Sequence, residues 1–354
     1  MLLYACISSH GYGHAARTAA VLCELAKRVP DCRLVLSTAV APEFLNLAMG
    51  DTPFVLRPCR WDVGMRQANA LDLDVEGTIA ALKQLELQLP AQIEAEAEWL
   101  ASQPTRPLIL ADVPPSAAQL ANRLCCPLIW LASFGWDAIY GPLGGAYAPW
   151  AEDAHALYRQ GDLLLRCPFS LPMEWGVYTV DVGFTSSTPR HDPLEVARRL
   201  ELPADRERCV LISFGGLGME IDPHWFTLWP EHVFVGVHPL LREVPNARLL
   251  PPDLRPLDAM PLVGRMITKP GYSSFCEALQ EGVGLHVVRR KDFAEAPVLE
   301  KGLREEGWHR FLEEEAFRQG LWELDQPLVR PRLPRISRNG SQRAAELLHR
   351  LLLR

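Results

Sequence analysis

Short apolar runs alternate along the chain with longer segments in which apolar residues recur every three or four positions. The first run, MLLYACI at 1–7, precedes the periodic segment HAARTAAVLCELAKRV at 14–29. The same order returns in CRLVLSTAV and APEFLNLAMG at 32–50, and again in PLILADVPPSAAQLANRL at 107–124. A short apolar run is typical of a buried parallel strand, and the longer spacing of an amphipathic helix. The pattern predicts a parallel sheet with helices on both faces.

A second series of the same kind begins after a stretch rich in Pro, Ser and Thr at 183–193. Its most distinct part is GRMITKPGYSSFCEALQEG at 264–282, which predicts a strand, a glycine turn and a helix. The chain is therefore expected to form two doubly wound α/β domains, residues 1–180 and 181–354. The last helix, within 339–354, could pack on either domain.

Composition excludes several classes of function. The 354 residues are 48% hydrophobic and 22% charged, with a net charge of −7, as in a soluble globular protein of about two domains. An acidic chain offers no basic field for nucleic acid or anionic lipid. No apolar stretch reaches the ~18 residues of a membrane span, and no basic segment precedes the first apolar run. The nine cysteines lack C-x2-C spacing and suit a reduced, cytoplasmic protein.

Three glycine-bearing turns follow predicted strands: HGYGH at 10–14, FGGLG at 214–218 and KPGYSS at 269–274. Ligands of open parallel sheets bind beyond the carboxyl ends of the strands. Glycine lets the backbone approach such a ligand, and the N-terminus of the next helix directs free N–H groups at an anion. The turns predict a cleft for a phosphorylated ligand, with these glycines as candidates: Gly11, Gly13, Gly215, Gly216 and Gly271.

The sequence matches other known kinds of phosphate and metal site less well. Gly11, Gly13 and Ala16 match a dinucleotide-binding fingerprint, but the second strand ends in Ser37 and Thr38, without the carboxylate that a ribose hydroxyl requires. This disfavours a Rossmann dehydrogenase. No P-loop sequence G-x-x-x-x-G-K-[ST] is present. The two histidines of the first turn lack a clear third ligand for zinc, so neither a metal nor a cofactor is expected.

The third turn indicates the chemistry of the ligand most specifically. In TKPGYSSFCEAL, Lys269 precedes the glycine, and Ser273 and Ser274 begin the predicted helix. A lysine and a helix N-terminus can hold a diphosphate. Glu277 lies three and four residues beyond the serines, hence on the same helix face, where its carboxylate can accept both hydroxyls of a ribose. The motif predicts a site for a nucleoside diphosphate.

This stretch resembles the donor-binding motif of plant UDP-sugar glycosyltransferases of the GT-B fold. In that motif a threonine, a phosphate-binding histidine, a glycine, an aromatic residue, small polar residues and a ribose-binding glutamate follow in order. Lys269 stands in the place of the histidine, Ser273 and Ser274 in the place of phosphate-binding Asn and Ser, and Glu277 in the place of the ribose ligand. The resemblance implies two Rossmann-like domains facing a central cleft, and a nucleotide-sugar donor that is most often UDP-linked.

A second resemblance is to the glycosyltransferase-like N-terminal region of plant-type L-arabinokinases. It rests on HGYGHAAR at 10–17, DVGMRQANALDLD at 62–74, FGWDAIY at 134–140, the segment at 264–282, and VVRRKDFAEAP ending at Pro297. The phosphate loop of the sugar-kinase half has no counterpart in this sequence. The resemblance therefore does not imply kinase activity.

The resemblance also implies a catalytic pair. In inverting GT-B enzymes, a histidine after the first strand often deprotonates the acceptor hydroxyl and is held by an aspartate from a later strand. The candidates are His14, with His10 in reserve, and Asp112; the pair Gly13-His14 aligns better with the family. A neutral imidazole bonded to a carboxylate can take up a proton, while the carboxylate orients the ring.

Recognition of the donor sugar departs from the plant pattern, in which an acidic residue is followed by Gln. Here Glu295 is followed by Ala296, so Arg290, Asp292 or Glu295 are the candidates for sugar contact. Candidates for an acceptor pocket, or else for packing of the domain interior, are Asp62, Gln67, Asp72, Trp136 and Asp137.

The function expected is metal-independent transfer of a sugar, with inversion, from a nucleotide sugar to an acceptor hydroxyl. Two alternatives stay open: a non-catalytic nucleotide-sugar-binding or regulatory module, and a nucleotide-sugar 2-epimerase.

Overall fold

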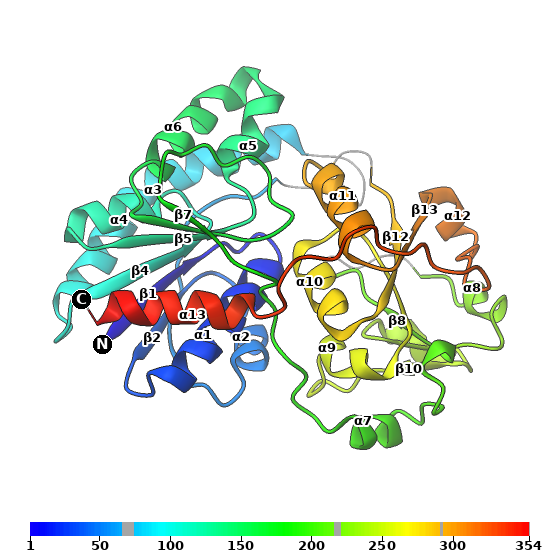
Figure 1. Cartoon of the computed structure of the whole chain (residues 1–354). Helices are drawn as coiled ribbons and strands as arrows, with labels where there is room; N and C mark the ends of the chain where they lie inside the picture. Colours follow the sequence, from blue (N-terminus) through cyan, green and yellow to red (C-terminus); the bar gives the residue numbers. More distant parts are fainter. Residues whose placement is uncertain (66–73, 216–220, 291–292, 354) are drawn as a thin grey trace. The chain divides into compact units, whose positions relative to one another are not determined.

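The computed structural model describes residues 1–65, 74–215, 221–290 and 293–353, which form two compact units. Unit 1 comprises Met1–Thr185 and Ser337–Arg354, and unit 2 comprises Ser186–Ile336. The segment after residue 336, which the sequence-based boundary assigned to the second domain, thus groups with unit 1. Figure 1 shows the helices and strands of both, and labels many of them.

Unit 1 is built on a seven-stranded parallel sheet of order β3-β2-β1-β4-β5-β6-β7. The order reverses between the central strands β1 and β4, so their carboxyl ends flank a topological switch point, where α/β sheets bind ligands. The strands are β1 Leu2–Ile7, β2 Arg33–Ser37, β3 Val55–Arg57, β4 Pro107–Asp112, β5 Leu128–Ala132, β6 Leu163–Arg166 and β7 Thr179–Asp181.

The helices of unit 1 bury apolar faces against this sheet and against one another. They are α1 Gly13–Arg28, α2 Pro42–Met49, α3 Val75–Ala101, α4 Ala117–Leu124, α5 Trp136–Tyr140, α6 Ala148–Tyr158 and α13 Gly340–Leu352. The last of them, α13, packs on α1 at the opposite end of the sequence, as the red and blue helices of Figure 1 show. Its inward positions Ala344, Ala345 and Leu348 are completely buried.

Several buried polar side chains of unit 1 are paired through hydrogen bonds. The Tyr4 hydroxyl on β1 lies 2.7 Å from Glu96 Oε2 on α3, and Arg57 on β3 binds the same carboxylate through two nitrogens, at 2.6 and 2.9 Å. Trp130 Nε1 donates to the carbonyl of Tyr158, whose hydroxyl donates to the carbonyl of Val113. Since an unpaired buried polar group destabilises the fold, these contacts fix how the helices lie on the sheet.

Unit 2 has a six-stranded parallel sheet of order β10-β9-β8-β11-β12-β13. Its order reverses between β8 and β11. The strands are β8 Cys209–Ile212, β9 Val233–Gly236, β10 Ala247–Leu249, β11 Arg265–Thr268, β12 Gly284–Val288 and β13 His309–Leu312. The helices are α7 Pro193–Arg199, α8 His224–Thr227, α9 Pro256–Ala259, α10 Tyr272–Glu281, α11 Ala296–Glu306 and α12 Glu314–Arg318.

The predicted α/β architecture, with two doubly wound parallel sheets, is confirmed. Within the described ranges, no helix combines the length and apolarity that crossing a membrane requires.

Candidate active site

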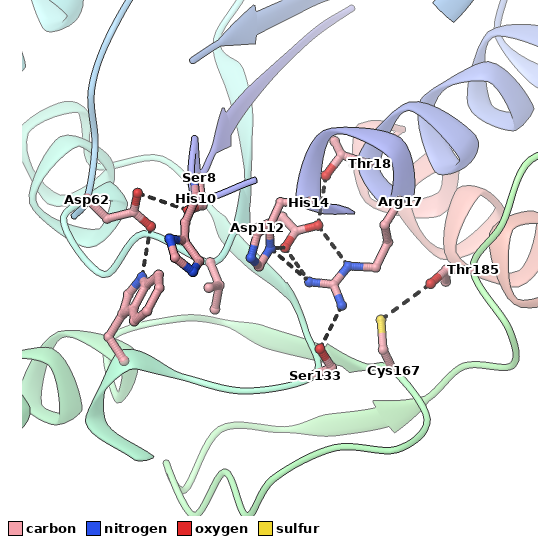
Figure 2. Close-up of polar contacts among 12 residues, drawn as sticks. Ser8, His10, His14, Arg17, Thr18, Asp62, Asp112, Ser133, Cys167 and Thr185 are labelled. Carbon is pink, nitrogen blue, oxygen red and sulfur yellow. Dashed lines mark hydrogen bonds and ion pairs between the residues drawn. The ribbon is translucent and has the colours of Figure 1, made fainter. Parts of the chain in front are cut away.

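The first candidate site lies at the switch point of unit 1. Strand register pairs Ile7 with Asp112, and the amide of Ser8 donates to the carbonyl of Asp112 at 2.8 Å, so the loop after β1 runs beside the end of β4. His14, the second residue of α1, then places Nδ1 at 2.7 Å from Asp112 Oδ1. The structure thus brings together two residues that the sequence suggested as base and orienting carboxylate (Figure 2).

Two further residues of α1, neither of them predicted from the sequence, bind the same carboxylate. Arg17 donates Nε to Asp112 Oδ2 at 2.9 Å and Nη2 to Asp112 Oδ1, and Thr18 Oγ1 donates to Oδ2 at 2.9 Å. These residues lie three and four positions after His14, hence on the same helix face. Arg17 Nη1 also donates to Ser133 Oγ, just after β5, at 2.9 Å. Helical spacing from His14 is the signal that could have revealed them.

The carboxylate of Asp112 is fully buried and ionised. Burial by itself would raise the pKa of Asp112, but the charges and hydrogen bonds of Arg17 and His14 outweigh it and lower that pKa to about 2. An ionised carboxylate requires a donor at His14 Nδ1, so the hydrogen of the neutral imidazole resides there. His14 Nε2 makes no hydrogen bond to the part of the chain that the structure describes, and the side chain is 9% exposed. Nε2 is therefore the nitrogen with a free lone pair.

His10 belongs to a neighbouring cluster. Its ring meets the edge of Trp136 with centroids 5.5 Å apart, and it fills the space beside Gly64, where a Cβ would lie 1.7 Å from His10 Nδ1. Asp62 accepts from Ser8 Oγ at 3.0 Å and from Trp136 Nε1 at 2.8 Å, as Figure 2 shows in part. Burial raises the pKa of Asp62, against these two hydrogen bonds. The Asp112 carboxylate, by contrast, binds His14, Arg17 and Thr18.

The remaining unit 1 candidates are placed as follows. Gly11 has φ +76°, which favours glycine, and its Cβ position is open; Gly13 begins α1, whose first turn has neither a side-chain cap nor an acidic residue. Asp137 binds His155 Nδ1 and Trp175 Nε1, both at 2.9 Å, at the edge of an open pocket of about 730 Å³. Gln67 and Asp72 lie outside the described residues.

The second candidate site lies at the carboxyl ends of β11 and β12 in unit 2. Lys269 directly follows β11 and Arg290 follows β12, and these strands are parallel neighbours. Burial lowers the pKa of Lys269 to about 8, and the charge of Arg290 contributes to this shift. Within the described residues the Lys269 ammonium makes no hydrogen bond or ion pair. Two cations held near each other in this way favour binding of an anion.

Helix α10 starts at the same edge of the sheet. Gly271 is its N-cap, without a side-chain cap, and Ser273 and Ser274 lie in its first turn. Glu277 lies one turn further along. Burial raises the pKa of Glu277 to about 7, with smaller opposite effects from Arg255 and Asp258. The Glu277 carboxylate makes no hydrogen bond or ion pair to residues in the described ranges, so it can accept hydroxyl groups of a ligand.

The structure describes some of the other binding candidates of unit 2. Gly215 follows β8 with φ +72° and an open Cβ position. Glu295 is buried at the N-cap of α11, and the Arg290 guanidinium lies 5.2 Å from the ring centre of Phe293. Gly216 and Asp292 lie outside the described residues. Among those that are described, no group of three or more His, Cys, Asp and Glu side chains is arranged to hold a metal ion.

Solved structures of glycosyltransferases share this architecture. A UDP-glucosyltransferase from Polygonum tinctorium matches 100% of this chain and 98% of its own, with TM-score 0.63 and 14% identity. The calicheamicin glycosyltransferase CalG4 gives TM-score 0.63 at 15% identity, again over 100% of this chain and 98% of its own. The chain has the GT-B fold. Arabidopsis thaliana UGT89C1, solved with UDP-L-rhamnose, shares this GT-B fold with TM-score 0.59 and 13% identity, over 98% of this chain and 88% of its own.

Sequence comparison gives a different relative of this GT-B chain. The chain is 27% identical over 310 residues to L-arabinokinase of Arabidopsis thaliana, and the match covers 83% of this chain. The chain spans 28% of the length of that relative. No protein-family model matches the sequence.

Proposed function

We propose that this protein is a glycosyltransferase, which transfers a sugar from a nucleoside-diphosphate sugar to an acceptor hydroxyl with inversion and without a metal ion. The observation that carries the proposal is the 2.7 Å contact between His14 Nδ1 and Asp112 Oδ1 at the switch point of unit 1. It gives a buried, oriented imidazole with one free nitrogen, which is what a general base for an alcohol requires.

The reaction is a single displacement. His14 Nε2 takes the proton of the acceptor hydroxyl as its oxygen forms a bond to the anomeric carbon of the donor sugar. The bond from that carbon to the diphosphate oxygen breaks, and its electron pair leaves with the diphosphate. Attack opposite to the leaving group inverts the anomeric configuration. Asp112 keeps the ring in place through its contact with Nδ1, without taking the proton itself.

Unit 2 supplies the groups that a nucleotide-sugar donor needs. The positive charges of Lys269 and Arg290, with the uncapped first turn of α10, are suited to the charge that develops on the leaving diphosphate. Glu277 is suited to accept both ribose hydroxyls. Because these positive groups are suited to the charge of the leaving diphosphate, we propose a reaction that needs no metal ion.

Uridine is the base we propose, because the GT-B structures described above include a UDP-glucosyltransferase and a complex with UDP-L-rhamnose. Arg290, Asp292 and Glu295 remain the proposed contacts of the donor sugar. The proposed acceptor is a compound that carries a hydroxyl group. Kinase activity is not proposed, since the similarity to L-arabinokinase covers 28% of that protein.

The donor site is tested first by thermal-shift titration with UDP, GDP, dTDP and ADP. A ligand that binds the native state alone raises the melting temperature. We expect a rise with UDP in the wild-type protein and no rise in Glu277→Ala. Glu195→Ala, which removes an exposed carboxylate of the same unit, is the matched control and should respond as wild type. A protein that responds to none of the four diphosphates would contradict the proposal.

Turnover is tested separately by mixing the protein with UDP-sugars and a panel of hydroxyl acceptors, with mass spectrometry of the products. A glycosylated acceptor together with free UDP is the expected result. Binding of UDP without any product would instead favour a binding module. Conversion of the donor to an isomeric nucleotide sugar, without an acceptor, would favour an epimerase.

A further inference from the structure

Arg17 is an unusual component of a histidine–aspartate pair, because it is a charged residue that the fold buries almost completely. Its side chain is 2% exposed, and that of Asp112 is 0% exposed. The guanidinium binds both oxygens of Asp112 and continues to Ser133, so it links α1, β4 and the end of β5 (Figure 2). Arginine forms such two-point contacts with carboxylates through its planar fork, which lysine cannot reproduce.

The contact between Arg17 and Asp112 determines the balance of charge around His14. Where a carboxylate faces a histidine alone, the carboxylate is the counter-ion of the imidazolium, and a buried site then favours the protonated ring. Here Arg17 already neutralises Asp112, and Arg17 Nη2 itself lies 3.3 Å from His14 Nδ1. A proton added to the ring would therefore bring a second positive charge into a buried cluster.

The other groups near the ring do not remove this effect. Asp62 interacts electrostatically with both His14 and Asp112, but its two carboxylate oxygens accept from Ser8 and Trp136. Phe134 is uncharged, and the centroid of its ring lies 5.5 Å from that of the His14 ring. His10 is a further titratable group of the cluster, and it lies on the side of Asp62, with its ring against Trp136. The hydroxyls of Tyr140 and Tyr158, which interact electrostatically with Asp62, are uncharged at neutral pH because burial raises the pKa of both.

We propose that Arg17 is a positioning residue that acts as the counter-ion of Asp112 and thereby holds His14 as the neutral tautomer, with hydrogen on Nδ1 and a free lone pair on Nε2. A general base must be unprotonated before it can accept a proton, so Arg17 keeps the base ready for use. Its contribution to catalysis rests on the proposed glycosyl transfer; its effect on the ring does not.

The test is nitrogen NMR of the imidazole at neutral pH, in wild type, Arg17→Gln and Arg17→Lys, with His14→Gln used to assign the signal. Wild type and Arg17→Lys should show one protonated and one bare ring nitrogen, with Nε2 bare. Arg17→Gln, which leaves the Asp112 charge uncompensated, should show two protonated nitrogens. A neutral ring in folded Arg17→Gln would overturn the proposal.

The wild-type spectrum keeps the proposal testable if Arg17→Gln does not fold. An imidazolium, or a ring with hydrogen on Nε2, in wild type at neutral pH would overturn it, and so would an imidazolium in Arg17→Lys. None of these measurements requires donor, acceptor or turnover. If only the proposed function is wrong, the spectra will be as expected but no sugar will be transferred. If only the role of Arg17 is wrong, the protein will transfer sugar but the spectra will differ from those expected.

Discussion

The ring of His10 occupies the space that a side chain at position 64 would need, since a Cβ on Gly64 would lie 1.7 Å from His10 Nδ1. The close approach of backbone and ring requires glycine there. Gly64→Ala must therefore displace His10, whereas Asp112 is bound by His14, Arg17 and Thr18, so we expect the His14–Asp112 contact to remain. This separates the two candidate bases.

We expect His14→Ala to lower the transfer rate by about 10²–10⁴-fold, the usual contribution of a general base. Gly64→Ala and His10→Ala should have similar effects, each smaller than that of His14→Ala. Initial rates with one donor and one acceptor measure all three. A larger loss in His10→Ala than in His14→Ala would assign the base to His10.

Donor affinity is expected to depend on pH with a maximum between two limbs. Glu277 accepts ribose hydroxyls best when ionised, so affinity should rise as pH increases through its pKa of about 7. Lys269 attracts a diphosphate when charged, so affinity should fall as pH increases through its pKa of about 8. Isothermal titration with a UDP-sugar measures this, because its diphosphate has no terminal group that titrates in this range.

Two variants assign the limbs of that profile. Glu277→Gln should remove the rising limb, and Lys269→Met should remove the falling limb and weaken binding throughout. An affinity in the wild-type protein that stays constant across both pKa values would show that neither residue contacts the donor.

The Arg17–Asp112 ion pair is expected to stabilise unit 1. The folded-state pKa of Asp112, about 2, lies below its ordinary value of 3.8, so its contribution to stability is present above the ordinary value and is lost as pH falls through about 2. Removal of one partner of a buried pair costs about 3–5 kcal/mol. Asp112→Asn should therefore unfold at lower urea concentration than wild type at neutral pH, and the difference should shrink with acidification. Arg17→Met combined with Asp112→Leu should be more stable than Arg17→Met alone.

The sequence predicted the elements that its apolar pattern makes distinct. Strands β1 and β4 are apolar along their length because helices cover both faces, and the register between them follows from the sheet. His14 and Asp112 could be proposed from the sequence because His14 lies at the start of the helix that follows one such strand, and Asp112 ends the other. Arg17 was not found, since arginine is almost always exposed unless paired, and its partner is 95 residues away in the sequence. The requirement for glycine at position 64 was not found either, because it depends on the position of the His10 ring.

The contact of α13 with α1 should be important for the stability of unit 1. Leu348 is completely buried there, whereas Leu353, just beyond the helix, is 63% exposed. Leu348→Ala should lower the free energy of unfolding by about 2–5 kcal/mol, as expected for a buried leucine. Leu353→Ala, the matched control, should change it by less than about 0.5 kcal/mol. Equal effects in urea unfolding would show that α13 does not pack as the structure has it.

The return of the chain to unit 1 after residue 336 determines the order in which the protein can fold on the ribosome. The amide of Phe184, in the segment that leaves unit 1, donates to the carbonyl of Ser337, in the segment that returns to it, at 2.8 Å, so unit 2 is an insertion whose two ends meet. Domains fold as units while synthesis proceeds from the N-terminus. Unit 2 can therefore be complete while α1 still exposes the apolar face that α13 covers. Residues 1–185 are synthesised before unit 2, yet they complete their packing only after α13 has been made.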